Sequence, residues 1–158
     1  MPNQNEAAAK LFKAKNIALR FLKVRDRSRQ EILERLKKDT FSDETINTAL
    51  EYLKNMRLVD DRQFTRTWIE ARLSKSFGLK RIAFELREKG IDEQLIDEEF
   101  LSLKSGNYSE EKVISEIVQV YCKKHKDITK EILKQKLAGY LTNRGFNEET
   151  IEEKLRTL

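Results

Sequence analysis

Apolar residues recur along the whole chain at intervals of three or four positions, which is the spacing of one face of an α-helix. Ile32 and Leu36, for example, lie four residues apart, as do Leu137 and Leu141. No segment alternates apolar and polar residues for long enough to predict a β-strand. The pattern therefore predicts an all-α chain with helices near residues 6–25, 29–38, 43–56, 61–75, 79–89, 93–103, 110–125, 130–143 and 148–157.

Helix-start and helix-stop signals agree with this division. The sequence Ser28-Arg29-Gln30-Glu31 is a capping box, in which the serine hydroxyl and the glutamate side chain each bond a backbone N–H at the helix start. Gly90 and Gly145 each follow a helical segment and are typical of a left-handed C-terminal turn. The paired acids Asp60 and Asp61 are expected to be residues of a helix start.

One set of six apolar positions occurs three times, first after a shift of 50 residues and then after a shift of 55. The turn glycines and the helix-start residues fall into the same register, which indicates a tandem repeat. We therefore expect three tandem three-helix repeats in an elongated, curved array, with residues 1–13 extending the first helix and repeats at 14–57, 58–106 and 107–158. The apolar sets are Ile32, Leu36, Phe41, Ile46, Leu50 and Leu53; Ile82, Leu86, Ile91, Ile96, Phe100 and Leu103; and Leu137, Leu141, Phe146, Ile151, Leu155 and Leu158.

The first repeat departs from this register at one position. Thr40 stands where the other repeats have Gly90 and Gly145. A β-branched residue is costly at positive φ. Either Asp39 adopts the left-handed turn, or the first repeat ends its second helix in another way.

Basic charge is concentrated near the N-terminus. The chain has 32 Lys and Arg against 27 Asp and Glu, a net charge of +5, and residues 10–29 contain eight basic residues and one acid. On a helical wheel four cations fall within about 80°, bordered by Ile17 and Val24. This stripe is either a solvated helix face or a surface for a polyanionic partner. Its cations are Lys13, Arg20, Lys23 and Arg27, and the inward face carries Ala14, Ala18, Phe21 and Leu22.

The sequence contains little that points to catalysis. Cys122 and His125 are the only residues of their kinds, and two such ligands cannot complete a zinc tetrahedron, so we expect a core thiol and a surface histidine. Neither a phosphate-binding P-loop nor a nucleophile elbow is present. Neither a secretory signal nor a run of about 20 apolar residues occurs. We therefore expect a cytoplasmic protein that is not an enzyme and has no cofactor or metal.

Three stretches, at residues 25–33, 58–64 and 78–91, together resemble a known family. Residues 78–91 match the pattern G-x-x-R-I-x-x-E-L-x-x-K-G-I, and residues 27–31 match R-S-x-x-E. The run Arg144-Gly145-Phe146, followed by Ile151, fits the last repeat of the same family. From about residue 14 to residue 158 the chain is similar to the RecX family, bacterial regulators of the RecA recombinase.

The resemblance implies the three-repeat fold and a function without catalysis. It implies a monomer that binds along the groove of the RecA–single-stranded-DNA filament, suppresses ATP hydrolysis and strand exchange, and makes at most weak direct contact with DNA. The alternatives are a sequence-independent DNA-binding helical module and a helical scaffold for peptides. Trp68 is either a core residue or a platform for base stacking. The candidate partner-binding residues are Arg20, Lys23, Arg25, Arg27, Arg72, Arg81, Arg87 and Lys89.

Overall fold

A computed structural model describes residues 3–158, and within this range the chain forms helices and no strand. Every helix expected from the sequence is present, and each observed end lies within two residues of the expected one, which confirms the all-α class. No helix in the described range is long and apolar enough to cross a bilayer. The helices are α1 (Gln4–Val24), α2 (Arg29–Lys38), α3 (Asp43–Asn55), α4 (Asp61–Leu73), α5 (Leu79–Glu88), α6 (Glu93–Ser105), α7 (Glu110–Lys124), α8 (Lys130–Asn143) and α9 (Glu148–Arg156).

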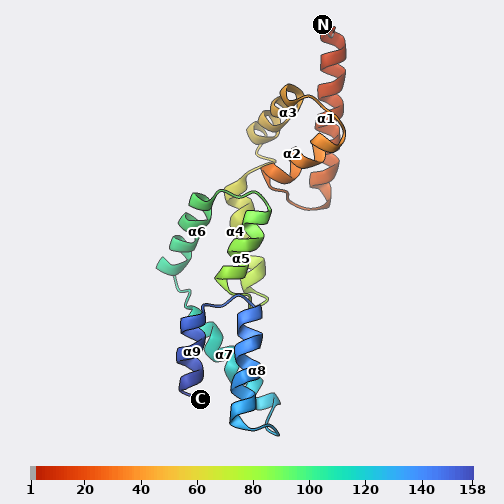
Figure 1. Ribbon diagram of the computed structural model, residues 1–158. Coiled ribbons are helices and arrows are strands. Elements are labelled where there is room, and N and C mark those ends of the chain that lie inside the picture. Colours follow the sequence, from red (N-terminus) through yellow and green to blue (C-terminus); the bar gives the residue numbers. More distant parts are fainter. Residues whose placement is uncertain (1–2) are drawn as a thin grey trace. The chain divides into compact units, whose positions relative to one another are not determined.

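The chain forms two compact units, and the division between them passes through α4 and α5. Unit 1 contains the chain up to Arg66 together with Arg87–Asp92, and unit 2 contains Thr67–Leu86 and Glu93–Leu158. In unit 1, helices α1, α2 and α3 pack against one another, as Figure 1 shows. Their apolar faces enclose one core, made of Ala14, Ile17, Ala18, Ile32, Leu36, Ile46, Ala49, Leu50, Leu53 and Val59.

In unit 2, helices α7, α8 and α9 form a second three-helix cluster (Figure 1). Its core consists of Ile114, Leu133, Leu137, Leu141, Phe146, Ile151 and Leu155. All positions of the three apolar sets are buried or half-buried, because each helix presents the same face to its neighbours. The tandem three-helix organisation is thus confirmed, while the repeat boundaries and the curved, elongated array stay predictions. Residues 1–2 of the expected N-terminal extension lie outside the described range.

The helix ends can be compared with the capping and turn residues expected from the sequence. Ser28 and Glu31 form the expected capping box at the start of α2. The carboxylate of Asp60 accepts hydrogen bonds from two backbone N–H groups of the first turn of α4, so Asp60 is a helix-start residue as expected. Thr40 itself holds φ at 60°, while Asp39 stays at −91°. The left-handed position of the first repeat is therefore occupied by the β-branched residue itself, so both expected alternatives, a left-handed Asp39 and a different helix end, were wrong.

Two expectations for the basic stripe on α1 were wrong. Arg27 does not share a helical face with Lys23, because α1 ends at Val24 and Arg25 adopts an extended conformation. Ile17 does not border an exposed stripe either, since it is buried in the core of unit 1. Val24 is exposed, as a border residue should be.

Candidate functional site

Two pairs of turns contact each other in equivalent ways, one pair in each unit. In unit 1, which holds the first junction, residues 27–31 meet residues 89–90; in unit 2, which holds the second junction, residues 77–81 meet residues 144–145. The shifts of 50 and 55 residues that relate the repeats also relate these segments. The two junctions can therefore be compared position by position.

Close backbone approach builds both junctions. In the first, the Ser28 hydroxyl donates to the carbonyl of Lys89 at 2.6 Å, and a Cβ on Gly90 would collide with the side chain of Gln30. In the second, the N–H of Gly78 donates to the carbonyl of Arg144 at 2.8 Å. A Cβ on Gly78 would collide with the backbone of residue 145. Only glycine therefore fits the contact points of these turns.

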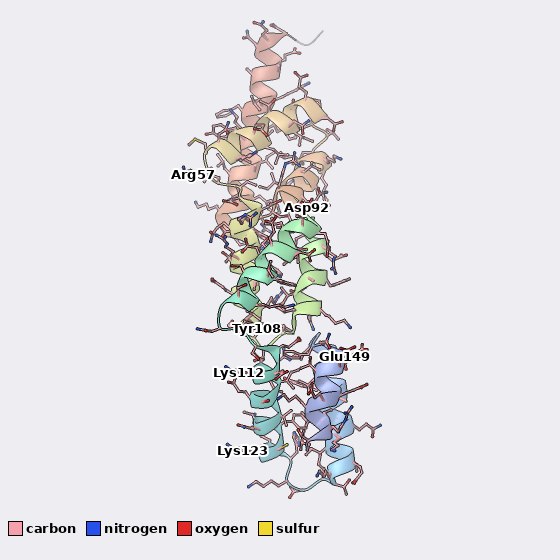
Figure 2. All side chains as sticks on the ribbon, turned by 90° about the vertical axis from the view of Figure 1, so that its left-hand side faces the viewer. Arg57, Asp92, Tyr108, Lys112, Lys123 and Glu149 are labelled. Carbon is pink, nitrogen blue, oxygen red and sulfur yellow. The ribbon has the colours of Figure 1, made fainter. Side chains whose placement is uncertain are left out.

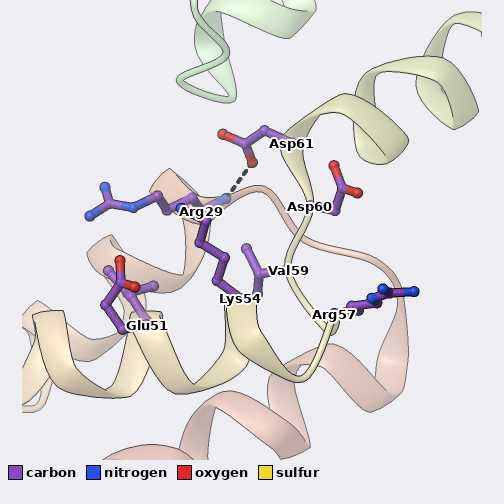
Figure 3. A pocket seen from close by; sticks show the side chains of 8 residues that line it. Arg29, Glu51, Lys54, Arg57, Val59, Asp60 and Asp61 are labelled. Carbon is purple, nitrogen blue, oxygen red and sulfur yellow. Dashed lines mark hydrogen bonds between the residues drawn. The ribbon is translucent and has the colours of Figure 1, made fainter.

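Each junction also holds a half-buried carboxylate at the start of a helix. Asp61 accepts from the backbone N–H of Arg29 at 2.8 Å, as the dashed line in Figure 3 shows. Glu110 accepts from the backbone of Leu79 and, at 3.3 Å, from the N–H of Asn147. Burial raises the pKa of both carboxyl groups above the ordinary value. These carboxylates occupy the positive ends of α2 and α5, where negative charge is favoured.

At the first junction, three predicted site residues surround one carboxylate. The distances to Glu31 are 2.7 Å from Arg25, 3.9 Å from Arg27 and 3.2 Å from Lys89. Burial by itself raises the pKa of Glu31, but hydrogen bonds from Arg25, from the Ser28 backbone and from Lys89 outweigh it, so the pKa lies below the ordinary value. This charge is therefore neutralised inside the junction.

Arg27 is held by more than the carboxylate. Its guanidinium lies 3.8 Å from the centre of the Phe21 ring and donates to the Phe21 carbonyl. Only 13% of its side chain is exposed. Burial, together with the neighbouring charge of Arg25, lowers the pKa of Arg27. The aromatic and ionic contacts offset this cost, so that Arg27 serves chiefly to hold the turn.

At the second junction, the equivalent positions carry different chemistry. Phe77 stands in the place of Arg27, Arg81 in that of Glu31, and Arg144 in that of Lys89. The Arg81 and Arg144 guanidinium groups lie 4.3 Å and 4.5 Å from the centre of the Phe77 ring. Two positively charged groups therefore lie against the same ring in the second junction. In the first junction, by contrast, the cations lie beside the Glu31 carboxylate.

One carboxylate partly balances this positive charge. Glu85 accepts from Arg72 Nε at 2.6 Å, from Arg81 Nε at 3.3 Å and from the indole N–H of Trp68 at 3.0 Å. Arg144 has no carboxylate partner within residues 3–158 and bonds the Tyr140 hydroxyl instead. Two of these three guanidinium groups thus share the Glu85 carboxylate and the third bonds no carboxylate, which leaves a surface suited to anions.

Local backbone conformation puts Phe77 in this place. Ser76 adopts φ of 58°, and the N–H of Phe77 turns back to the carbonyl of Arg72 at 3.2 Å, which ends α4. Gly78 follows and bonds the turn after α8, so the ring lies between the cations of α5 and of that turn. The position of the site thus depends on the short sequence Ser-Phe-Gly.

The structure brings some predicted residues together and leaves others apart. Arg25, Arg27 and Lys89 meet at Glu31, and Arg72 and Arg81 meet at Glu85. By contrast, α1 carries Arg20 and Lys23 on an exposed face beside a shallow hollow, and Arg87 is exposed in the last turn of α5. Trp68 is half-buried, with the Arg72 guanidinium 4.6 Å from its ring.

Sequence reasoning missed Phe77, Glu85 and Arg144 as site residues. A signal for Arg144 was available, because the register that aligns Gly90 with Gly145 also aligns Lys89 with Arg144. No local pattern distinguishes Phe77 from a core residue, and Glu85 carries no sign that it collects three donors. Their roles depend on contacts between separate helices.

Two further features of the described chain are weaker candidates for a site. A hollow of about 480 Å³ in unit 1 is lined by Glu51, Lys54 and Arg57, and by Asp60 and Asp61, whose carboxylates already bond helix starts (Figure 3). No group of three His, Cys, Asp or Glu side chains within residues 3–158 is placed to hold a metal ion. Cys122 packs half-buried against the core of α7–α9, and His125 ends α7. The second junction is the stronger candidate.

Comparisons with known proteins point in one direction. Residues 14–53 match the family model described as RecX, first three-helix domain, and residues 60–98 match RecX, second three-helix domain. The regulatory protein RecX of Prosthecochloris aestuarii is 36% identical over 149 residues, which cover 92% of this chain and 93% of that protein. That of Chlorobium phaeobacteroides is 32% identical over 144 residues, covering 90% and 91%.

Solved structures show the same architecture. The crystal structure of RecX from Lactobacillus salivarius superposes with a TM-score of 0.80 at 18% identity, covering 96% of this chain and 99% of that one. A second crystal structure, of a regulatory protein RecX, gives a TM-score of 0.77 at 20% identity, covering 100% and 81%. At these identities the likeness concerns the fold.

Proposed function

Because the chain belongs to the RecX family of regulatory proteins, we propose that it regulates the RecA recombinase, mainly as an inhibitor. It binds as a monomer along the groove of the RecA–single-stranded-DNA filament, in the cytoplasm and without a cofactor. Binding there suppresses ATP hydrolysis and strand exchange. The proposal rests on family membership and on the chemistry of the second junction.

The observation that carries the proposal is the coincidence of the family-like pattern with the second junction. Gly78, Arg81 and Glu85, all within the pattern at residues 78–91, build the turn contact and the cluster that follows it. The cluster leaves more cations than carboxylates at the surface of unit 2. A nucleoprotein filament is a polyanion, and such a surface attracts it at long range.

The predicted residues take different parts in this interaction. Arg72 and Arg81 contact the filament, and Arg20, Lys23 and Arg87 add attraction from exposed positions. Arg25, Arg27 and Lys89 are positioning residues, since they hold the first junction through Glu31. Val24, 78% exposed, adds an apolar contact that salt does not weaken.

Inhibition of the RecA ATPase on single-stranded DNA tests these parts. Arg81→Ala combined with Arg87→Ala should relieve inhibition about tenfold or more, as expected for the loss of two charge-assisted contacts. Arg35→Ala combined with Lys38→Ala removes the same charge from α2 and is the matched control, which should inhibit normally. Melting temperatures of both double variants establish that they remain folded. Equal inhibition by both would contradict the proposed surface.

The competing function is a sequence-independent DNA-binding module. The cation-rich second junction favours it to the extent that it would attract any nucleic acid. The module predicts equal affinity for naked DNA and filament, with a parallel loss as salt rises, and no inhibition of ATP hydrolysis at saturation. The regulator predicts that filament binding survives at physiological salt. Titration of both ligands across ionic strength, with ATPase measured alongside, separates the two.

A further inference from the structure

A hollow in unit 1 lies beside the loop that joins α3 to α4. Its volume is about 480 Å³, and its lining comes from α2, α3, this loop and the first residue of α4 (Figure 3). The apolar part of the lining is Leu50 and Val59, both of which are buried. The regulation proposed above gives this hollow no role.

The equivalent loop of unit 2 carries an aromatic side chain at the same place. Asp60 and Ser109 each accept hydrogen bonds from the first turn of the following helix, α4 or α7, so they are equivalent helix-start residues. The residue immediately before each is Val59 in unit 1 and Tyr108 in unit 2. Tyr108 is half-buried on the loop before α7 (Figure 2). By this register, a tyrosine ring stands in unit 2 where unit 1 has a valine and a hollow.

The surroundings of Tyr108 favour its ring more than its hydroxyl. Within residues 3–158 the buried hydroxyl has no hydrogen-bond partner, and burial together with the charge of Glu110 raises the pKa of Tyr108. The shift of 50 residues places Leu101 of unit 2 at the position of Glu51 in unit 1. The hollow of unit 1 therefore has a carboxylate acceptor that the tyrosine of unit 2 lacks.

The charged lining of the hollow complements a tyrosine side chain. Within the described part of the chain, Lys54 and Arg57 have no carboxylate partner, and Glu51 has no cationic partner. Cations are attracted to the negative face of an aromatic ring. The chain already makes such a contact where Lys15 Nζ lies 4.0 Å from the centre of the Tyr52 ring. A carboxylate, in turn, accepts a hydrogen bond from a phenolic hydroxyl.

We propose that this hollow is a docking site for an exposed tyrosine side chain of a partner protein. The ring packs on Val59 between Lys54 and Arg57, and the hydroxyl donates to Glu51. A strongly acidic or basic ligand gains little here, because the lining as a whole balances three cations with three carboxylates. A leucine side chain would use the apolar floor but not the charged groups. This docking goes beyond the proposed regulation, which rests on the cations of unit 2.

The test is titration of the isotope-labelled full chain with N-acetyl-tyrosinamide, followed by amide chemical shifts and without RecA. The shifts should map to residues 50–61. Val59→Tyr introduces the residue that unit 2 has, fills the hollow and should abolish these shifts. Lys54→Ala should weaken binding about two- to fivefold through the loss of one cation–π contact. Lys37→Ala removes the same charge from an exposed position of α2 and should leave the affinity unchanged.

Two further comparisons do not depend on the stability of Val59→Tyr. Tyr108→Val removes the ring from unit 2 and should create a second set of shifts around Lys104, the equivalent of Lys54. N-acetyl-phenylalaninamide and N-acetyl-leucinamide should bind the wild type more weakly than N-acetyl-tyrosinamide, because the first lacks the hydroxyl and the second lacks the ring. Melting temperatures establish which variants remain folded.

Three outcomes would overturn the proposal. One is the absence of shifts at residues 50–61 in the wild type. Another is equal binding of all three amides, which would leave no role for the ring or its hydroxyl. The third is an affinity for N-acetyl-tyrosinamide that is the same in wild type, Lys54→Ala and folded Val59→Tyr. Since RecA is absent, these results are independent of ATPase inhibition.

Discussion

The first and second junctions have equivalent backbone contacts but different arrangements of charged side chains. In both, a helix start docks on a glycine-containing turn, and a half-buried carboxylate, Asp61 or Glu110, bonds the helix start. They differ where Glu31 is replaced by Arg81. The first junction gathers its cations on an internal anion, whereas the second places Arg81 and Arg144 on one ring.

This difference shows why a cation in a family-like stretch does not by itself mark a binding site. The Arg27 side chain is 13% exposed, and its guanidinium pairs with Glu31 and lies on the Phe21 ring. The Arg81 side chain, by contrast, is 45% exposed. Exposed ion pairs contribute little to stability. We therefore expect substitutions at the first junction to lower stability, and substitutions of cations at the second to lower binding.

Exchange of the helix-start residues should give the largest effect. Gly78→Ser forces a side chain into the backbone of residue 145 and should lower the free energy of unfolding by about 3 kcal/mol or more. The reverse change at the first junction, Ser28→Gly, loses only the bond to the Lys89 carbonyl and part of the cap, about 1–2 kcal/mol. Urea denaturation measures both. Equal losses in the free energy of unfolding would mean that the two junctions tolerate a change of the helix-start residue equally well.

Removal of the internal anion should have the next largest effect. Glu31→Gln leaves Arg25, Arg27 and Lys89 facing one another without a counter-charge and should cost about 2 kcal/mol. The matched change Glu85→Gln affects the more exposed cluster of Arg72 and Arg81 and should cost about 1 kcal/mol. Thermal melting compares the two variants. A larger loss for Glu85→Gln would reverse the assignment of structural and binding roles.

Acidification should weaken the first junction more than the second. Because the pKa of Glu31 is lowered, its stabilisation is complete above the ordinary glutamate value and is lost as pH falls through the folded-state value. Asp61 and Glu110 have raised pKa values, so their contributions are lost as pH rises, but each junction holds one of them. Amide hydrogen exchange should show protection of α2 falling below that of α5. In Glu31→Gln this difference should disappear.

The smallest effect is expected at the turn that belongs to neither junction. Thr40→Gly should raise stability by about 0.5–1 kcal/mol, since a β-branched residue at φ of 60° is strained. The equivalent position in the first junction is the comparison: Gly90→Ala should lower stability, because that position has both positive φ and the Gln30 side chain against it. Differential scanning calorimetry resolves both. A loss of stability in Thr40→Gly would show that the threonine side chain contributes more than its backbone costs.

The sequence by itself determined the helices, their caps and the repeat register. These follow from interactions within a few residues: apolar faces at three- and four-residue spacing, the capping box at Ser28, and glycines at positive φ. Register alone also singled out Thr40 as the departure in the first repeat, but the two expected ways around its strain were wrong, because Thr40 itself holds positive φ. The error at Arg27 arose because α1 ends at Val24, three residues before it, so that helical geometry no longer applied.

Only the tertiary structure decided which cations are neutralised by carboxylates within the fold and which remain exposed to a partner. Ser28 and Lys89 are 61 residues apart, and Gly78 meets Arg144 across a similar separation. The counter-charge and exposure of a side chain depend on such contacts, because electrostatic energy is set by distance and burial rather than by order along the chain. For this reason the sequence predicted a binding role for both Arg27 and Arg81. Packing made Arg27 a structural residue and left Arg81 exposed.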